Sequence, residues 1–224
     1  MANLMFEATK IIHQNNDWIT LVFIIIFIVL TFAKVIFKNR LSHVNTLFLS
    51  KKYLSIYFNK EKSNFLSLFQ ILLSIVQLLA LALLFYLVNM YFQFQPELFN
   101  FKGYTLIFFY VSLYFSLYFF MGLLLAFLFN FKKVHNKIVY DKMNYFNNLI
   151  MWLLPFLVIS VYVNQFQKIS LEITFFVFVL LLILRYSLIV LNNKKFIYKN
   201  LFYFILYLCS LEIAPLIIVL KLTI

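Results

Sequence analysis

The sequence has little glycine, proline or cysteine, and each shortage excludes a kind of site. Its two glycines, Gly103 and Gly122, can form neither a glycine-rich phosphate-binding loop nor a GxxxG helix-pairing motif. The single cysteine, Cys209, excludes an intrachain disulfide and any site made of two thiols. Scarce glycine and proline also argue against the broken helices that often build transporter sites.

Residue combinations typical of metal binding and catalysis are missing as well. His13, His43 and His135 lie in the N-terminal segment or between apolar runs, without the paired spacing of a helix-bound metal site. The apolar runs hold neither a pair of aspartates nor a Ser–His pair, which argues against intramembrane proteolysis. Asp141 falls in a basic connection, where we interpret it as solvated. We predict no metal and no cofactor, and a membrane enzyme ranks third among the function classes.

Charged residues are also few. They make up 12% of the chain, against roughly 25% in soluble domains, while hydrophobic residues make up 65%. The net charge of +12 comes from lysines and arginines that cluster between apolar runs, where such residues set membrane orientation. The charge therefore predicts topology and contact with the lipid bilayer, and no nucleic-acid partner.

Apolar runs of membrane-spanning length define the fold class. We predict an all-α polytopic transmembrane helical bundle of about six helices, in a single integral-membrane domain over residues 1–224. No small-residue cleavage site precedes the basic segment after the first run, so this run should remain as a helix. The expected helices cover 18–37, 65–91, 104–131, 147–164, 172–192 and 200–222.

Basic residues alternate between the two sides of the expected bundle. Seven lie in 34–62, four in 132–146 and three in 193–199. The termini and the other connections carry only four, which are Lys10, Lys102, Lys168 and Lys221. Because Lys and Arg concentrate on the cytoplasmic side, we expect both termini to face outward.

The cytoplasmic connection 38–64 contains apolar residues around Lys51 and Lys52, which indicates an interfacial helix. These apolar side chains can lie in the headgroup region, cover the cytoplasmic ends of neighbouring helices, or form a docking surface for another protein. All three alternatives bury the same residues, which are Leu47, Phe48, Leu49, Tyr53, Leu54, Ile56, Tyr57 and Phe58.

The second apolar run carries a polar stripe at spacings of three, four and three residues, which places its members on one helical face. Its members are Ser67, Gln70, Ser74 and Gln77. Interhelical hydrogen bonding explains the stripe directly, although a substrate path could use the same residues. In the third run, Tyr110, Tyr114 and Tyr118 share a face, which we also interpret as packing.

Arg185 and Glu212 each lie inside an apolar run, where a lone charge is expensive. The basic connection between these runs is short, so the two helices should be antiparallel neighbours. Counting from the turn, the two α-carbons differ in depth by roughly 7 Å, which a long arginine side chain can largely cover. Pro215 cannot donate to the Leu211 carbonyl and so leaves a polar backbone gap beside Glu212.

Three interpretations of this pair remain open. A buried structural ion pair between Arg185 and Glu212 would fix the packing of the last two helices. A proton or ion relay through Glu212 is the functional alternative, and contact with a partner helix is the third.

The C-terminal stretch from Phe202 to Lys221 is an aromatic run that leads into Leu211-Glu212-Ile213-Ala214-Pro215-Leu216 and ends in a lysine. It resembles a family of small inner-membrane proteins from Bacteroidota that is catalogued as a domain of unknown function. The resemblance implies a bacterial inner (cytoplasmic) membrane location, and it offers no catalytic residues to carry over.

These observations favour a non-enzymatic inner-membrane subunit or assembly factor of bacterial envelope machinery, with membrane proteins and lipid as its partners. The alternative is a small transporter or proton-coupled membrane component that uses Glu212 and Arg185.

Overall fold

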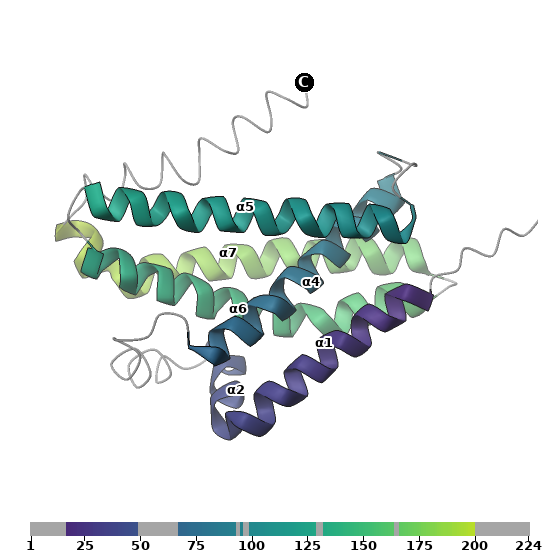
Figure 1. Cartoon of the computed structure of the whole chain (residues 1–224), viewed down its shortest axis with the longest axis horizontal. Coiled ribbons are helices and arrows are strands. Elements are labelled where there is room, and N and C mark those ends of the chain that lie inside the picture. The colour runs from purple at the N-terminus through teal and green to yellow at the C-terminus, as the bar shows by residue number, and fades with distance from the viewer. Residues whose placement is uncertain are drawn as a thin grey trace, which may run out of the picture.

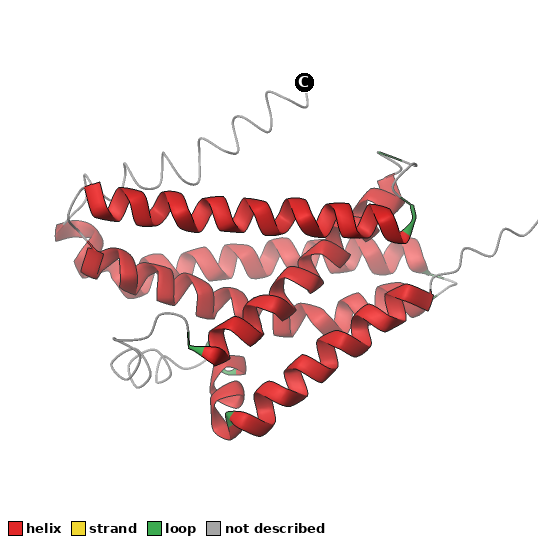
Figure 2. Cartoon of the chain, in the orientation of Figure 1, coloured by secondary structure: helices red, strands yellow, loops and turns green. Residues whose placement is uncertain are grey.

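The computed structural model describes residues 17–48, 67–92, 95, 99–128, 132–163 and 166–199, and most of these residues are helical. Figure 2 shows helices joined by short loops, with no strand in these ranges. The helices are α1 (Asp17–Ile36), α2 (Lys38–Asn45), α4 (Leu68–Phe92), α5 (Phe101–Leu128), α6 (Lys132–Tyr162) and α7 (Gln167–Lys199).

Five of these helices, all but the short α2, are long and apolar enough to cross a membrane. The chain is therefore a membrane protein, and the predicted all-α transmembrane bundle is confirmed. The sixth predicted helix, 200–222, lies outside the described residues, and so do Glu212 and Pro215.

The long helices alternate in direction. In Figure 1, the start of α1, the ends of α4 and α6, and the starts of α5 and α7 lie on the right. The end of α1, the start of α4, the end of α5 and the start of α6 lie on the left and lower side, which we call the basic end. It takes this name from Lys34, Lys38 and Lys137, while Lys102 and Lys168 lie at the opposite end.

Helix α6 begins at Lys132, although the apolar run predicted a helix only from 147. Asp141, Asn144 and Asn147 interrupt the apolar character of this segment, and all three side chains are buried. A membrane helix need not be apolar where it faces other helices, because interhelical hydrogen bonds can satisfy its polar groups. The segment assigned to a solvated basic connection is therefore the first part of α6, and Asp141 is buried within it.

Helix α4 lies at the centre of the bundle and contacts α1, α5, α6 and α7. Its alanines and leucines form the main apolar core with α1 and α6. At the end opposite the basic end, the Trp18 ring packs against Tyr86 and Tyr104, with centroids 4.9 and 5.1 Å away. Aromatic contacts therefore join α1, α4 and α5 there.

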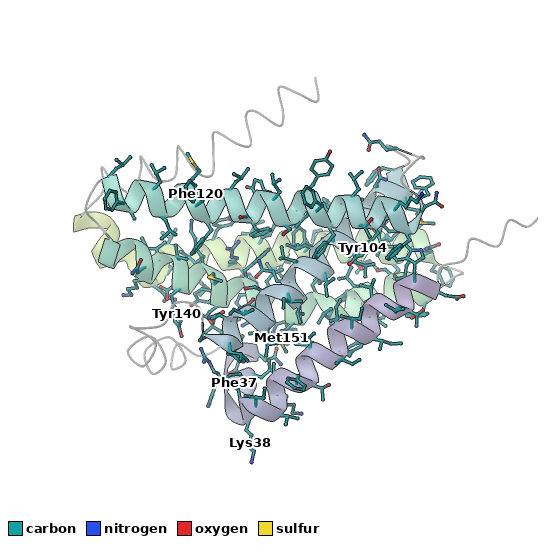
Figure 3. The ribbon with its side chains drawn as sticks, in the orientation of Figure 1. Phe37, Lys38, Tyr104, Phe120, Tyr140 and Met151 are labelled. Atoms are coloured by element: carbon teal, nitrogen blue, oxygen red, sulfur yellow. The ribbon has the colours of Figure 1, made fainter. Side chains whose placement is uncertain are left out.

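Helix α2 folds back against the basic end of the bundle. Leu41, Val44 and Leu47 are buried there, in a cluster with residues of α4, α6 and α7. The Arg40 guanidinium lies 4.2 Å from the Phe69 ring centroid, while Lys38 points away from the bundle (Figure 3). The described part of the 38–64 connection thus covers the ends of neighbouring helices, one of the three alternatives, and residues 49–64 lie outside the described ranges.

Candidate functional site

Gln70 joins α4 to α6 through both ends of its carboxamide. Its Nε2 donates to Asn144 Oδ1 at 2.9 Å, and its Oε1 accepts from Asn147 Nδ2 at 3.0 Å. Asn144 Nδ2 in turn donates to the Tyr140 carbonyl at 2.8 Å. Gln70 is 2% exposed, and both asparagines are equally inaccessible. The middle of the polar stripe therefore faces protein.

The other members of the stripe lie on the same side of α4. Ser74 Oγ donates to the Gln70 carbonyl at 2.8 Å, and Ser67 Oγ accepts from the Gln70 amide nitrogen at 3.4 Å. Both bonds stay within the chain around α4 and do not reach another helix. Gln77 is buried one turn beyond Ser74. Interhelical bonding is thus concentrated at Gln70.

A second polar face runs along α6, formed by Asp141, Asn144, Tyr145 and Asn148 at spacings of three, one and three residues. This is the i, i+3, i+4, i+7 pattern of one helical face, and all four side chains are buried. Sequence reasoning missed this face because the segment was assigned to a loop. The spacing rule that found the α4 stripe would have found it too.

Helix α7 meets this face through Asn192, whose Nδ2 donates to the Tyr145 hydroxyl. Asp141 lies about one helical turn before the same tyrosine on α6. We call Asp141, Tyr145, Asn148 and Asn192 the Asn148 cluster. Asn148 Oδ1, Asn148 Nδ2 and Asn192 Oδ1 are buried and have no hydrogen-bond partner within the described part of the chain. The cluster is thus polar, enclosed and incompletely satisfied.

Arg185 lies on α7 and reaches toward α6. One terminal nitrogen donates to the Lys142 carbonyl at 3.3 Å, and the guanidinium lies 4.5 Å from the Phe146 ring centroid. The Lys142 ammonium donates to the Tyr118 hydroxyl on α5 at 3.0 Å. Aromatic faces and a backbone carbonyl therefore contact the arginine charge. The predicted Arg185–Glu212 pair stays a prediction, since Glu212 is not among the described residues.

At the opposite end, hydroxyl groups hold α6 and α7 together. Ser160 and Thr174 share a hydrogen bond of 2.6 Å between their side-chain oxygens. The Tyr91 hydroxyl donates to Glu172 Oε1 at 2.9 Å, so Glu172 is tied to α4. Within the described ranges, no group of three or more His, Cys, Asp or Glu residues is placed to hold a metal ion.

The helices and their buried polar contacts define a polytopic α-helical membrane protein in which several buried polar side chains join one helix to another. The chain belongs to the family described as domain of unknown function DUF4271, whose model matches residues 19–223. No curated protein and no solved structure matches it.

Proposed function

We propose that this protein is a non-enzymatic subunit or assembly factor of envelope machinery in the bacterial inner membrane. The observation that carries the proposal is the Gln70 carboxamide, because both of its polar atoms bond to α6. A polar group that joins two helices is not free to line a substrate path, and it fixes how the helices pack. The most prominent polar stripe of the sequence thus supports a structural role.

Helix α5 supports contact with another membrane protein. Few of its described side chains are buried, and these are Gly103, Tyr104, Gly122 and Ala126. Large aromatic side chains are exposed on this helix, among them Tyr110, Phe120 and Phe127. Figure 3 labels Phe120. Tyrosine concentrates at membrane interfaces, so an exposed Tyr110 inside the span favours a protein neighbour over lipid.

The distribution of charge supports the inner-membrane location. Lys34, Lys38 and Lys137 gather at the basic end, whereas the described part of the opposite end carries Lys102 and Lys168. Positive charge retained on one side is typical of proteins inserted into a cytoplasmic membrane.

Site-specific photocrosslinking in cells tests the subunit role. A photoreactive phenylalanine analogue would replace Tyr110 or Phe127 on α5, and in a control Phe32, which is exposed on α1. The protein would then be purified in mild detergent. We expect the α5 positions to crosslink to another membrane protein. That protein should also co-purify with the chain when no crosslink is formed.

Two results would overturn the proposal. Crosslinks from α5 only to residues 200–222 of the same chain would show that this face is covered internally. A solitary protein with ion flux in proteoliposomes that Glu212→Gln abolishes would instead support the transporter.

A further inference from the structure

The corner between α1 and α2 carries two exposed lysines. Lys34 lies in the last turn of α1, Lys38 is the first residue of α2, and both side chains are exposed. Figure 3 shows the Lys38 side chain pointing away from the bundle. No residue from 19 to 60 is an aspartate or a glutamate. The neighbouring sequence therefore supplies no acid to neutralise the two lysines.

The acidic residues described in other helices are remote from the corner or buried. Asp17 and Glu172 lie near the starts of α1 and α7, at the end opposite the basic end. Helix α2 packs against α1 and α6, and the α6 acid, Asp141, is 3% exposed. Within the described ranges, no exposed acid lies at the basic end. The positive charge of the corner thus favours an anionic partner.

The corner lies at the depth of the lipid headgroups. Helix α1 has 20 residues and is about 30 Å long, which is the thickness of the hydrocarbon core, so its end reaches the interface. Trp152 Nε1 donates to the carbonyl of Asn45, the last residue of α2, at 3.3 Å, and the Trp152 side chain is exposed. Tryptophan concentrates at membrane interfaces. Both observations place α2 beside lipid headgroups.

An apolar stripe on α1 leads to the corner. Its members are spaced by four, three, four and three residues, so they share one helical face, and each is at least 40% exposed. They are Leu21, Ile25, Ile28, Phe32 and Val35. The stripe is about 21 Å long, and one leaflet of hydrocarbon is about 15 Å deep. It is therefore long enough to accompany an acyl chain through one leaflet.

The exposed threonines of α1 are already hydrogen-bonded. Thr31 Oγ1 donates to the Phe27 carbonyl at 2.6 Å, and Thr20 Oγ1 accepts from the Tyr162 hydroxyl at 2.9 Å. Lipid tails offer no hydrogen bonds, so a helix that faces them must have its polar groups satisfied within the protein. These threonines meet that condition, which favours lipid as the neighbour of α1.

We propose that the α1–α2 corner binds an anionic phospholipid. Its phosphate contacts the ammonium groups of Lys34 and Lys38, and one acyl chain lies along the α1 stripe. Lysine binds phosphate as a point charge, and basic residues next to a membrane span attract anionic lipids. The site does not depend on the subunit role, because a bound lipid is compatible with a subunit and with a transporter.

Lipid titration of the purified full-length protein in mild detergent tests the site. Phosphatidylglycerol and phosphatidylcholine with the same acyl chains would be compared, and native mass spectrometry would count the bound lipid. We expect phosphatidylglycerol to bind saturably and more tightly. Each lysine near an anionic headgroup contributes about fivefold in affinity, so Lys34→Gln combined with Lys38→Gln should weaken phosphatidylglycerol binding roughly 25-fold. Phosphatidylcholine binding should change little.

Lys102→Gln combined with Lys168→Gln is the matched control, because it removes the same charge at the opposite end and should leave phosphatidylglycerol affinity unchanged. Lys34→Arg combined with Lys38→Arg keeps the charge and should retain the affinity. Phosphatidylglycerol with a photoreactive acyl chain should label the α1 stripe. Equal affinities for the two lipids would overturn the proposal. So would an equal loss of affinity in the two double glutamine variants, which would show that total charge alone attracts the lipid.

Discussion

At the scale of single residues, Gln70 shows how one carboxamide can join two membrane helices. It is both donor and acceptor toward α6, so Asn144 Oδ1 and Asn147 Nδ2 have these hydrogen bonds only while Gln70 is present. Sequence spacing placed Gln70 on a protein-facing side of its helix. It could not identify Asn144 and Asn147 as partners, because they lie 74 and 77 residues away in the chain.

Gln70→Leu should lower the free energy of unfolding by about 1–3 kcal/mol, because it leaves buried polar atoms of Asn144 and Asn147 unpaired. Denaturant titration in detergent micelles measures the change. Ser74→Ala is the matched control and should change stability little, since the Ser74 hydroxyl bonds only within its own helix. An equal decrease in the free energy of unfolding in the two variants would contradict the role of Gln70 in joining α4 to α6.

For Arg185, the contacts in the structure can be compared with only part of the sequence prediction. The apolar run around it predicted a buried charge with a partner, and the structure gives it the Phe146 ring and the Lys142 carbonyl. A double-mutant cycle with Arg185→Met and Glu212→Gln tests the predicted ion pair. We expect a coupling energy above about 1 kcal/mol in the unfolding free energy. A coupling near zero would mean that the described contacts alone accommodate the arginine.

At the scale of elements, α6 is where the sequence prediction departed furthest from the structure. Hydropathy marks helices that face lipid, so the polar segment before 147 was assigned to a loop. The bundle buries residues 138–142 and 144–146 of that segment, and α6 contacts α2, α4, α5 and α7. Its polar residues repeat with helical spacing, and this periodicity was the available signal.

A proline substitution distinguishes a helix from a loop at this position. Met143→Pro should lower stability by about 3 kcal/mol or more, because it removes a hydrogen bond inside α6 and clashes with the preceding turn. Lys102→Pro is the control, since the first turn of α5 tolerates proline. Helical content and unfolding in detergent would be compared by circular dichroism. A Met143→Pro variant as stable as the Lys102→Pro variant would contradict the long α6.

At the scale of the whole molecule, the alternation of helix directions collects basic residues at one end. The predicted orientation places that end in the cytoplasm. In a Cys209→Ser background, single cysteines at Lys38 and Lys168 would be tested with a membrane-impermeant maleimide. Lys168→Cys should react in spheroplasts, whereas Lys38→Cys should react only after the membrane is opened, since the two lie at opposite ends. The reverse pattern would invert the topology.

The sequence by itself determined that this protein lies in a membrane, that it is helical, and that its basic segments alternate between the two sides. Each of these follows from local composition, because a run of apolar residues must form a helix in lipid whatever its neighbours are. Only the tertiary structure decided which polar side chains meet. Gln70 with Asn147, and Tyr145 with Asn192, are pairs of residues far apart in the chain that are brought together by helix packing. Interhelical contacts depend on the rotation and the depth of both helices. The hydropathy of one segment predicts neither the rotation nor the depth.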